Sequence, residues 1–247
     1  MPEAWLEDFA PFSPPHAAAV AVCAGMMVAA CRLGRRFGRG SARERRLRIA
    51  WGVAIVAMAL ARAGWYFLPS RFDITSSLPL HICDLGLAVA ALAMLTGWRP
   101  WQTLLYFWGI GLSTQAFITP TLNFGVGFAE FYLFWIGHTM VVGSAVYDLV
   151  VGGYRPRAAD LALAMAATLV YVALMLPLNL WLDANYGFVG PGTPSNPTLV
   201  DAFGPWPWRV GVIVALGALG FVMLWAVWPL SRRVLGGRGP ARGSGGT

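Results

Sequence analysis

Seven stretches of mostly apolar residues, each about long enough to cross a bilayer, constrain this sequence of 247 residues more than any other feature. A membrane-spanning helix needs about 20 such residues to cross about 30 Å of hydrocarbon. A segment in lipid must also satisfy its own backbone hydrogen bonds, which favours α-helices. We therefore predict an all-α, polytopic membrane protein with seven transmembrane helices. Their approximate bounds are 14–33, 49–68, 78–97, 101–119, 131–151, 159–181 and 208–230.

The positions of the arginines predict the orientation of the bundle. All 18 basic residues are arginine, and only 12% of the chain is charged. Fifteen of the arginines lie at or after the ends of the first, third, fifth and seventh stretches. Because positively charged loops stay in the cytoplasm, the N-terminus is predicted outside and the C-terminus inside. The fifteen are Arg32, Arg35, Arg36, Arg39, Arg43, Arg45, Arg46, Arg48, Arg99, Arg155, Arg157, Arg232, Arg233, Arg238 and Arg242, and the other three are Arg62, Arg71 and Arg209.

Composition excludes several classes of protein. A chain without lysine cannot form a retinal or pyridoxal Schiff base, so a seven-helix light-driven pump is excluded. We interpret the net charge of +7 as the flanks of membrane helices, with membrane lipids and no nucleic acid as partners. The three cysteines indicate no disulfide framework. Residues 1–13 are predicted as an outer segment without a cleaved signal, 14–230 as the membrane domain, 183–207 as a long outer loop, and 231–247 as a disordered cytoplasmic tail.

Polar side chains from five of the stretches are predicted to lie at one depth. At 1.5 Å per residue they fall about 6–12 Å below the outer ends of their helices. Polar groups are costly in lipid, so they usually face a partner or a cavity. We therefore predict a cavity that opens toward the outer leaflet. The residues of this layer are Arg62, His81, Cys83, Asp84, Gln115, Thr119, His138 and Asn179.

The third stretch has the densest chemistry, because His81, Cys83 and Asp84 lie within four residues. On a regular helix His81 and Asp84 share a face, whereas His81 and Cys83 point in nearly opposite directions. A base for the Cys83 thiol must then come from another helix, and His138 is the remaining histidine inside the bundle. The alternative is that Cys83 is simply a small buried residue.

The supporting polar residues have simpler interpretations as well. Arg62 and Asp84 are the right types for a structural ion pair between the second and third helices. Gln115 and Asn179 are typical of hydrogen bonds between membrane helices. No motif indicates a cofactor or a metal site.

Taken together, the motifs resemble those of the YwaF-like bacterial integral membrane proteins, from about Phe9 to Leu230. That group is distantly similar to the transmembrane protein 164 acyltransferases, which are relatives of the androgen-induced membrane hydrolases. The resemblance implies a multi-pass protein of the inner (plasma) membrane and a Cys–His pair that moves fatty-acyl chains between phospholipids. The motifs are Leu78-Pro79-Leu80-His81-Ile82-Cys83-Asp84, Phe107-Trp108-Gly109-Ile110-Gly111, Gln115-Ala116, Thr119-Pro120, Gly137-His138, Gly153-Tyr154-Arg155-Pro156, Pro177-Leu178-Asn179, Asn185-Tyr186 and Leu199-Val200-Asp201 through Gly204-Pro205-Trp206-Pro207-Trp208.

Three functional hypotheses follow. In the first, Cys83 attacks an acyl ester, His138 transfers the proton, and Arg62, His81, Asp84, Gln115 and Asn179 support them. In the second, the same polar layer belongs to a non-enzymatic permease or lipid-binding protein. In the third, His81 and His138 are paired haem ligands.

Overall fold

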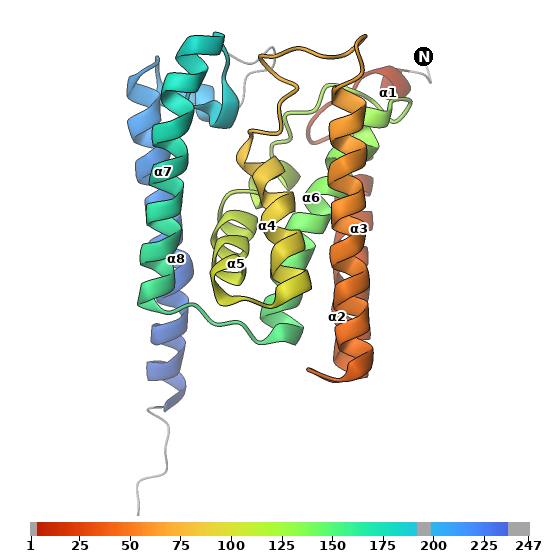
Figure 1. The fold of residues 1–247 in the computed structure, drawn as a ribbon, viewed down its shortest axis with the longest axis vertical. Helices are drawn as coiled ribbons and strands as arrows, with labels where there is room; N and C mark the ends of the chain where they lie inside the picture. Colours follow the sequence, from red (N-terminus) through yellow and green to blue (C-terminus); the bar gives the residue numbers. More distant parts are fainter. Residues whose placement is uncertain (1–3, 192–198, 237–247) are drawn as a thin grey trace, which may run out of the picture.

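The computed structural model describes residues 4–191 and 199–236, and it is built from helices and turns with one isolated β-bridge between Asp8 and Phe124. The predicted all-α fold is therefore confirmed over the part of the chain that the structure describes (Figure 1). The elements are α1 Ala4–Glu7, α2 Pro14–Phe37, α3 Ala42–Tyr66, α4 Ile82–Thr96, α5 Arg99–Leu104, η1 Leu105–Ile110, η2 Thr114–Phe117, α6 Ala129–Tyr147, η3 Asp148–Gly152, α7 Ala158–Leu182, η4 Tyr186–Phe188, η5 Leu199–Phe203 and α8 Trp208–Gly236.

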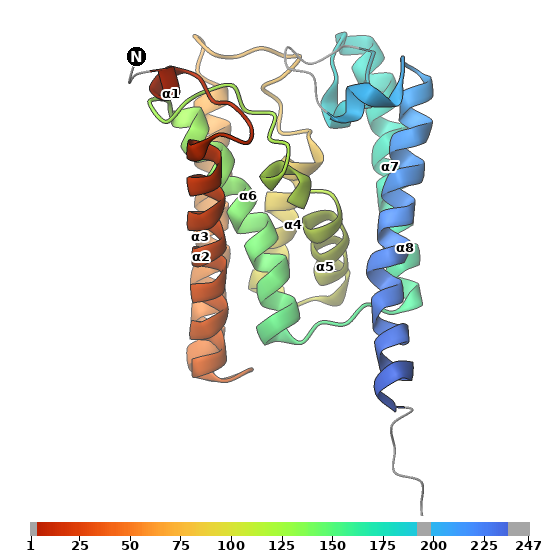
Figure 2. The same ribbon diagram turned by 180° about the vertical axis from the view of Figure 1, so that it is seen from behind.

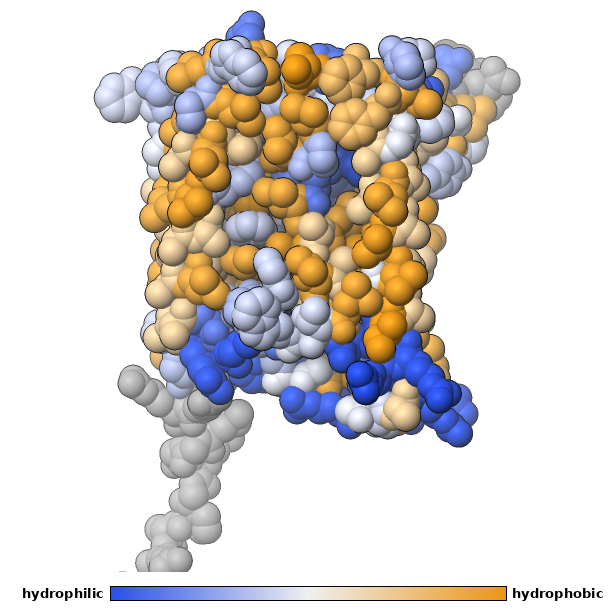
Figure 3. Space-filling view, viewed as in Figure 1, coloured by the Kyte–Doolittle hydropathy of each residue, from blue (hydrophilic) through white to orange (hydrophobic). Residues whose placement is uncertain are grey.

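Within the part of the chain that the structure describes, five helices are long and apolar enough to cross a membrane. These are α2, α3, α6 together with η3, α7 and α8, and each has 23 to 25 residues in its candidate span. Their outward-facing side chains are large and apolar, and the space-filling view shows this apolar surface above one strongly hydrophilic end, with apolar and hydrophilic residues mixed at the other end (Figure 3). Such a band suits lipid rather than water. The chain is a multi-pass membrane protein.

The third and fourth predicted stretches form shorter helices than expected. Residues 78–81 are not helical, so α4 has only 15 residues and ends at Gly97, which adopts the left-handed conformation at φ 65°. The next stretch is split into α5, the π-helix η1 and the 3-10 helix η2. Figures 1 and 2 show α4 and α5 in the middle of the molecule, between α2, α3 and α6 on one side and α7 and α8 on the other. Because protein covers them, they need not match the lipid thickness.

Close contacts hold α4, α6 and η1 together. A Cβ atom on Gly86 of α4 would lie 3.3 Å from a methyl carbon of Val141 on α6. On η1, a Cβ atom on Gly109 would lie 3.1 Å from the Cβ of Ala145, also on α6. These glycines allow the helix backbones to approach closely, as small residues do in membrane bundles. The three elements form the centre of the main apolar core.

The helix ends differ modestly from the predicted bounds. The helix α2 begins at the predicted residue, whereas α3 begins at Ala42, before its predicted start at 49. The hydroxyls of Ser13 and Ser41 cap these two helices by accepting backbone N–H bonds in the first turns. At the other end of the chain, α8 continues to Gly236, so the first part of the predicted tail is helical. The rest of that tail, 237–247, and residues 192–198 of the predicted outer loop lie outside the described residues.

Candidate functional site

Cys83 is the second residue of α4 and is half-buried. Its sulfur accepts a hydrogen bond from the hydroxyl of Ser113, with an Oγ–Sγ distance of 3.9 Å. Ser113 is completely buried in the short connection between η1 and η2, where its N–H bonds the carbonyl of Trp108 at 2.9 Å. Ser113 was not predicted as a site residue from the sequence. It could have been noticed as a hydroxyl side chain two residues before Gln115, in the same predicted stretch.

His138 lies on α6 and is buried. Its Nδ1 is 2.8 Å from the carbonyl oxygen of Phe134. A carbonyl can only accept a hydrogen bond, so Nδ1 carries the proton and Nε2 is the acceptor of the neutral ring. The ring also packs against Phe134 and Phe117, with centroid distances of 4.2 and 6.5 Å. This fixed tautomer is the one that a base acting through Nε2 needs.

The packing of α4 against α6 puts Cys83 and His138 at the same level of the bundle. The two helices run in the same direction (Figure 1), and Gly86 meets Val141. Cys83 and His138 each lie three residues before these contact positions, on the preceding turn. Both side chains face residues 113–117, Cys83 through Ser113 and His138 through Phe117.

Cys83 and His138 do not hydrogen-bond each other in the described structure. The sulfur is bonded by Ser113, and the ring is bonded by the Phe134 carbonyl. A catalytic hydrogen bond is often long in the unliganded enzyme and tightens with substrate. The observed arrangement is thus a thiol and an imidazole that both face residues 113–117 without direct contact.

Arg62 of α3 and Asp84 of α4 form an ion pair next to this pair. The Nε–Oδ1 distance is 2.9 Å, and the Asp84 side chain is 8% exposed. The guanidinium of Arg62 also lies over the ring of Tyr66, 5.2 Å from its centroid. These residues line a pocket of about 40 Å³ between α3, the start of α4 and residues 76–79. The charges of Arg62 and Asp84 act on both Cys83 and His138.

The other predicted site residues have different neighbours. Asn179 is completely buried, and its amide donates to the carbonyl of Tyr186 at 2.8 Å and accepts from the N–H of Tyr186 at 2.7 Å. His81, just before α4, accepts from the N–H of Gly187 at 3.4 Å and packs on Tyr186. Gln115 is exposed on η2. None of the three side chains contacts Cys83 or His138 through a hydrogen bond in the described residues.

The structure does not support the haem hypothesis. No group of three or more His, Cys, Asp or Glu side chains is close enough to hold a metal within residues 4–191 and 199–236. His81 faces η4, whereas His138 faces residues 113–117. The two rings therefore do not converge on one position, as paired axial ligands would.

A known protein family matches most of this chain. The family model that matches, described as the TMEM164 family, spans residues 11–225 and includes both Cys83 and His138. No curated protein and no solved structure matches the chain. The predicted relationship to the transmembrane protein 164 proteins is thus confirmed, while kinship with the YwaF-like group stays a prediction. This chain belongs to the TMEM164 family.

Proposed function

We propose that this protein is a membrane enzyme that transfers or hydrolyses fatty-acyl groups of (phospho)lipids through Cys83 and His138. One observation carries the proposal: a thiol and an imidazole lie on adjacent helices at one level, and both face residues 113–117. The Nε2 atom of His138 is the acceptor, because Nδ1 donates to a backbone carbonyl. Membership of the TMEM164 family is compatible with a lipid-related enzyme.

The proposed reaction has two halves. First, His138 Nε2 takes the thiol proton, and the thiolate of Cys83 attacks the ester carbonyl carbon. The tetrahedral intermediate then releases the lipid alcohol, which takes the proton from the imidazolium and leaves an acyl thioester on Cys83. In the second half, His138 accepts a proton from a lysolipid hydroxyl or from water, and that oxygen attacks the thioester. The acyl group leaves as a new ester or as a fatty acid, and the proton returns to the sulfur.

The neighbours of the thiol suggest supporting roles. Ser113 already donates to the sulfur, and we assign it the positioning of Cys83. The Arg62–Asp84 ion pair holds α3 against the start of α4, where Cys83 lies. Asn179 is a poor candidate to stabilise an oxyanion, because it is completely buried and its amide oxygen and nitrogen both pair with the backbone of Tyr186.

Acyl-adduct mapping tests the proposal directly. Purified full-length protein is incubated with a fatty-acyl p-nitrophenyl ester, and peptides are analysed by mass spectrometry before and after hydroxylamine, which cleaves thioesters. We expect a hydroxylamine-sensitive adduct on Cys83, absent in Cys83→Ser. His138→Ala should slow its formation by about 10²–10⁴-fold, the usual contribution of a general base.

Cys31→Ala is the matched control, because Cys31 is another buried cysteine in the apolar core. In this variant, Cys83 should be acylated at the wild-type rate. Equal labelling of Cys83 and Cys31, or normal labelling of Cys83 in His138→Ala, would contradict the proposal. Lipid binding that survives loss of Cys83 but not of Arg62 would favour the non-enzymatic hypothesis instead.

We also propose that the two short central helices complete seven crossings of the inner (plasma) membrane. The seven helical segments alternate in direction, and the end of α8 lies at the opposite end of the molecule from the N-terminus (Figure 1). Together with the arginine distribution, this supports an outer N-terminus and a cytoplasmic C-terminus.

A further inference from the structure

A second, polar pocket lies at the opposite end of α4 from Cys83. It has a volume of about 850 Å³. Cys83 is the second residue of α4 and Arg99 follows its end, so at 1.5 Å per residue α4 separates the two sites by about 20 Å. The pocket is lined by Arg39, by Arg99 and Gln102 of α5, by residues 152–157, and by Trp225, Trp228 and Pro229 of α8.

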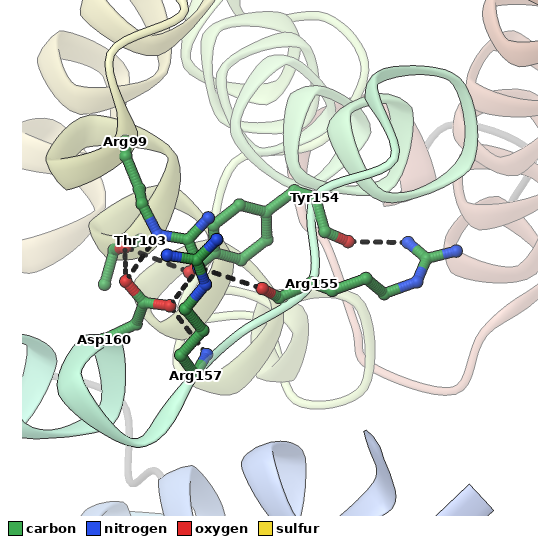
Figure 4. Close-up of polar contacts among 6 residues, drawn as sticks. All are labelled: Arg99, Thr103, Tyr154, Arg155, Arg157 and Asp160. Atoms are coloured by element: carbon green, nitrogen blue, oxygen red, sulfur yellow. Dashed lines mark hydrogen bonds and ion pairs between the residues drawn. The ribbon is translucent and has the colours of Figure 1, made fainter. Parts of the chain in front are cut away.

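Behind the lining residues Arg99 and Arg157 lies a fully bonded carboxylate, that of Asp160 (Figure 4). Its Oδ1 accepts from Arg99 Nε at 3.0 Å and from Thr103 Oγ1 at 3.1 Å. Its Oδ2 accepts from Arg99 Nη2 and from the backbone N–H of Arg157. Burial raises the pKa of Tyr154, whose hydroxyl lies 3.0 Å from Thr103. Asp160 therefore neutralises Arg99 and has no acceptor position left for another arginine.

The remaining arginines of the pocket are held without a carboxylate. Arg155 Nη1 donates to the carbonyls of Leu149 and Tyr154 at 2.8 and 2.6 Å, and its guanidinium lies 4.4 Å from the ring centroid of Trp228. Within the described residues, neither Arg155 nor Arg157 nor Arg39 forms an ion pair. These three positive charges thus face one concave site without an ion pair, and the nearest carboxylate, that of Asp148, lies behind Gly152.

Two further features suit a bound anion. Arg39 reaches the pocket closely only because residue 153 is glycine, since a Cβ atom on Gly153 would overlap its guanidinium. The other nearby carboxylate, Asp148, accepts a hydrogen bond from Gln102 at 2.9 Å and does not line the pocket. Planar guanidinium groups bind phosphate oxygens through paired hydrogen bonds.

The position of the pocket relates it to the membrane surface. Hydrophilic residues gather at this end of the molecule, directly below the apolar band (Figure 3). Trp98, at the same end, is 61% exposed, which suits a headgroup layer. Basic pockets between transmembrane helices at this level bind the headgroups of anionic lipids.

We infer that the pocket formed by Arg39, Arg155, Arg157 and the α8 tryptophans binds a phosphate group, that of an anionic lipid headgroup or of a soluble phosphorylated molecule. This site is separate from Cys83 and does not depend on the proposed acyl transfer.

Binding to the purified full-length protein tests the inference. Thermal unfolding in a neutral detergent is followed during titration with phosphatidylglycerol, with phosphatidylcholine and with inorganic phosphate. We expect phosphatidylglycerol or inorganic phosphate to raise the unfolding temperature more than phosphatidylcholine does. Stabilisation by phosphatidylglycerol alone assigns the lipid headgroup, and equal saturable stabilisation by inorganic phosphate assigns a soluble anion.

The variant Arg155→Gln/Arg157→Gln should weaken this binding by about tenfold or more, because each residue contributes charge-assisted hydrogen bonds. Arg43→Gln/Arg46→Gln is the matched control, since it removes the same charge from exposed positions on α3 outside the pocket. An equal loss in the control, or no stabilisation by any probe, would overturn the inference.

A second measurement uses the unmodified protein, so it holds even if the double variant does not fold. Hydrogen–deuterium exchange of the backbone amides in 152–157 should slow with the stabilising probe and not with phosphatidylcholine. Unchanged exchange in this segment with every probe would also overturn the inference.

Discussion

Among the predicted site residues, Asn179 has a structural role. Its amide pairs with both the N–H and the carbonyl of Tyr186. The Tyr186 hydroxyl in turn donates to the carbonyl of Ile74 at 2.7 Å and accepts from the N–H of Leu78 at 3.1 Å. Asn179 thus fixes the link between the loop after α7 and the residues that precede α4.

Replacing Asn179 should therefore reduce stability rather than chemistry. Asn179→Ala leaves two buried backbone groups of Tyr186 without partners, which costs about 2–4 kcal/mol. We expect a clear fall in the thermal unfolding temperature in detergent. Asn123→Ala, at an exposed asparagine, is the control and should change it little. Wild-type stability in Asn179→Ala would show that these bonds are not needed.

The sequence predicted the chemical types of the site residues better than their partners. Cys83 and His138 could be singled out because reactive side chains are costly inside apolar stretches. Asn179 was expected to bridge helices, yet it bonds backbone atoms of a loop residue seven positions later. That pairing depends on how the loop returns to the helix end, which no local pattern specifies. Ser113 was missed for a similar reason, because its importance comes only from its distance to Cys83.

At the scale of elements, hydropathy predicted the five long helices well and the two short central ones poorly. The 20-residue criterion assumes that lipid surrounds a helix along its whole length. Protein surrounds α4, α5 and η1 instead, so α4 begins four residues after the predicted start and the next helix breaks into π and 3-10 turns. The break places Ser113 beside Cys83. Single-turn π segments are frequent at functional sites.

The close approach of η1 to α6 leads to a prediction about Gly109. Valine at this position would clash with Ala145, and it would push η1 away from α6. Overpacking of this kind costs about 1–3 kcal/mol. We expect Gly109→Val to lower the unfolding temperature and also to slow acylation of Cys83, because Ser113 moves with η1. In Gly25→Val, the control on α2, the added side chain meets open space, and both readouts should stay near wild type. Equal effects of the two variants would contradict this account of the packing.

At the scale of the whole molecule, the helices alternate in direction, so the segments that connect them lie at two opposite ends. These two ends differ in their residues. The arginine-rich end contains the α2–α3 loop, the α4–α5 turn and residues 152–157. The opposite end contains α1 and the loop between α3 and α4, and Cys83 lies closer to this end. The two candidate sites therefore lie at different depths. Cys83 and His138 lie nearer one end of the molecule, and the arginine pocket lies at the other.

Accessible cysteines test this orientation in intact cells. The three native cysteines are first removed by Cys23→Ala, Cys31→Ala and Cys83→Ser. A single cysteine is then introduced by Ser76→Cys or by Arg43→Cys, at exposed positions on opposite ends of the molecule. A membrane-impermeant maleimide should label Ser76→Cys from outside and Arg43→Cys only after permeabilisation, because arginine-rich loops are retained in the cytoplasm. The reverse pattern would place the Cys83 site near the cytoplasmic surface. Labelling of both from outside would mean that α2 and α3 do not cross the membrane as a pair, and the seven-crossing topology would be wrong.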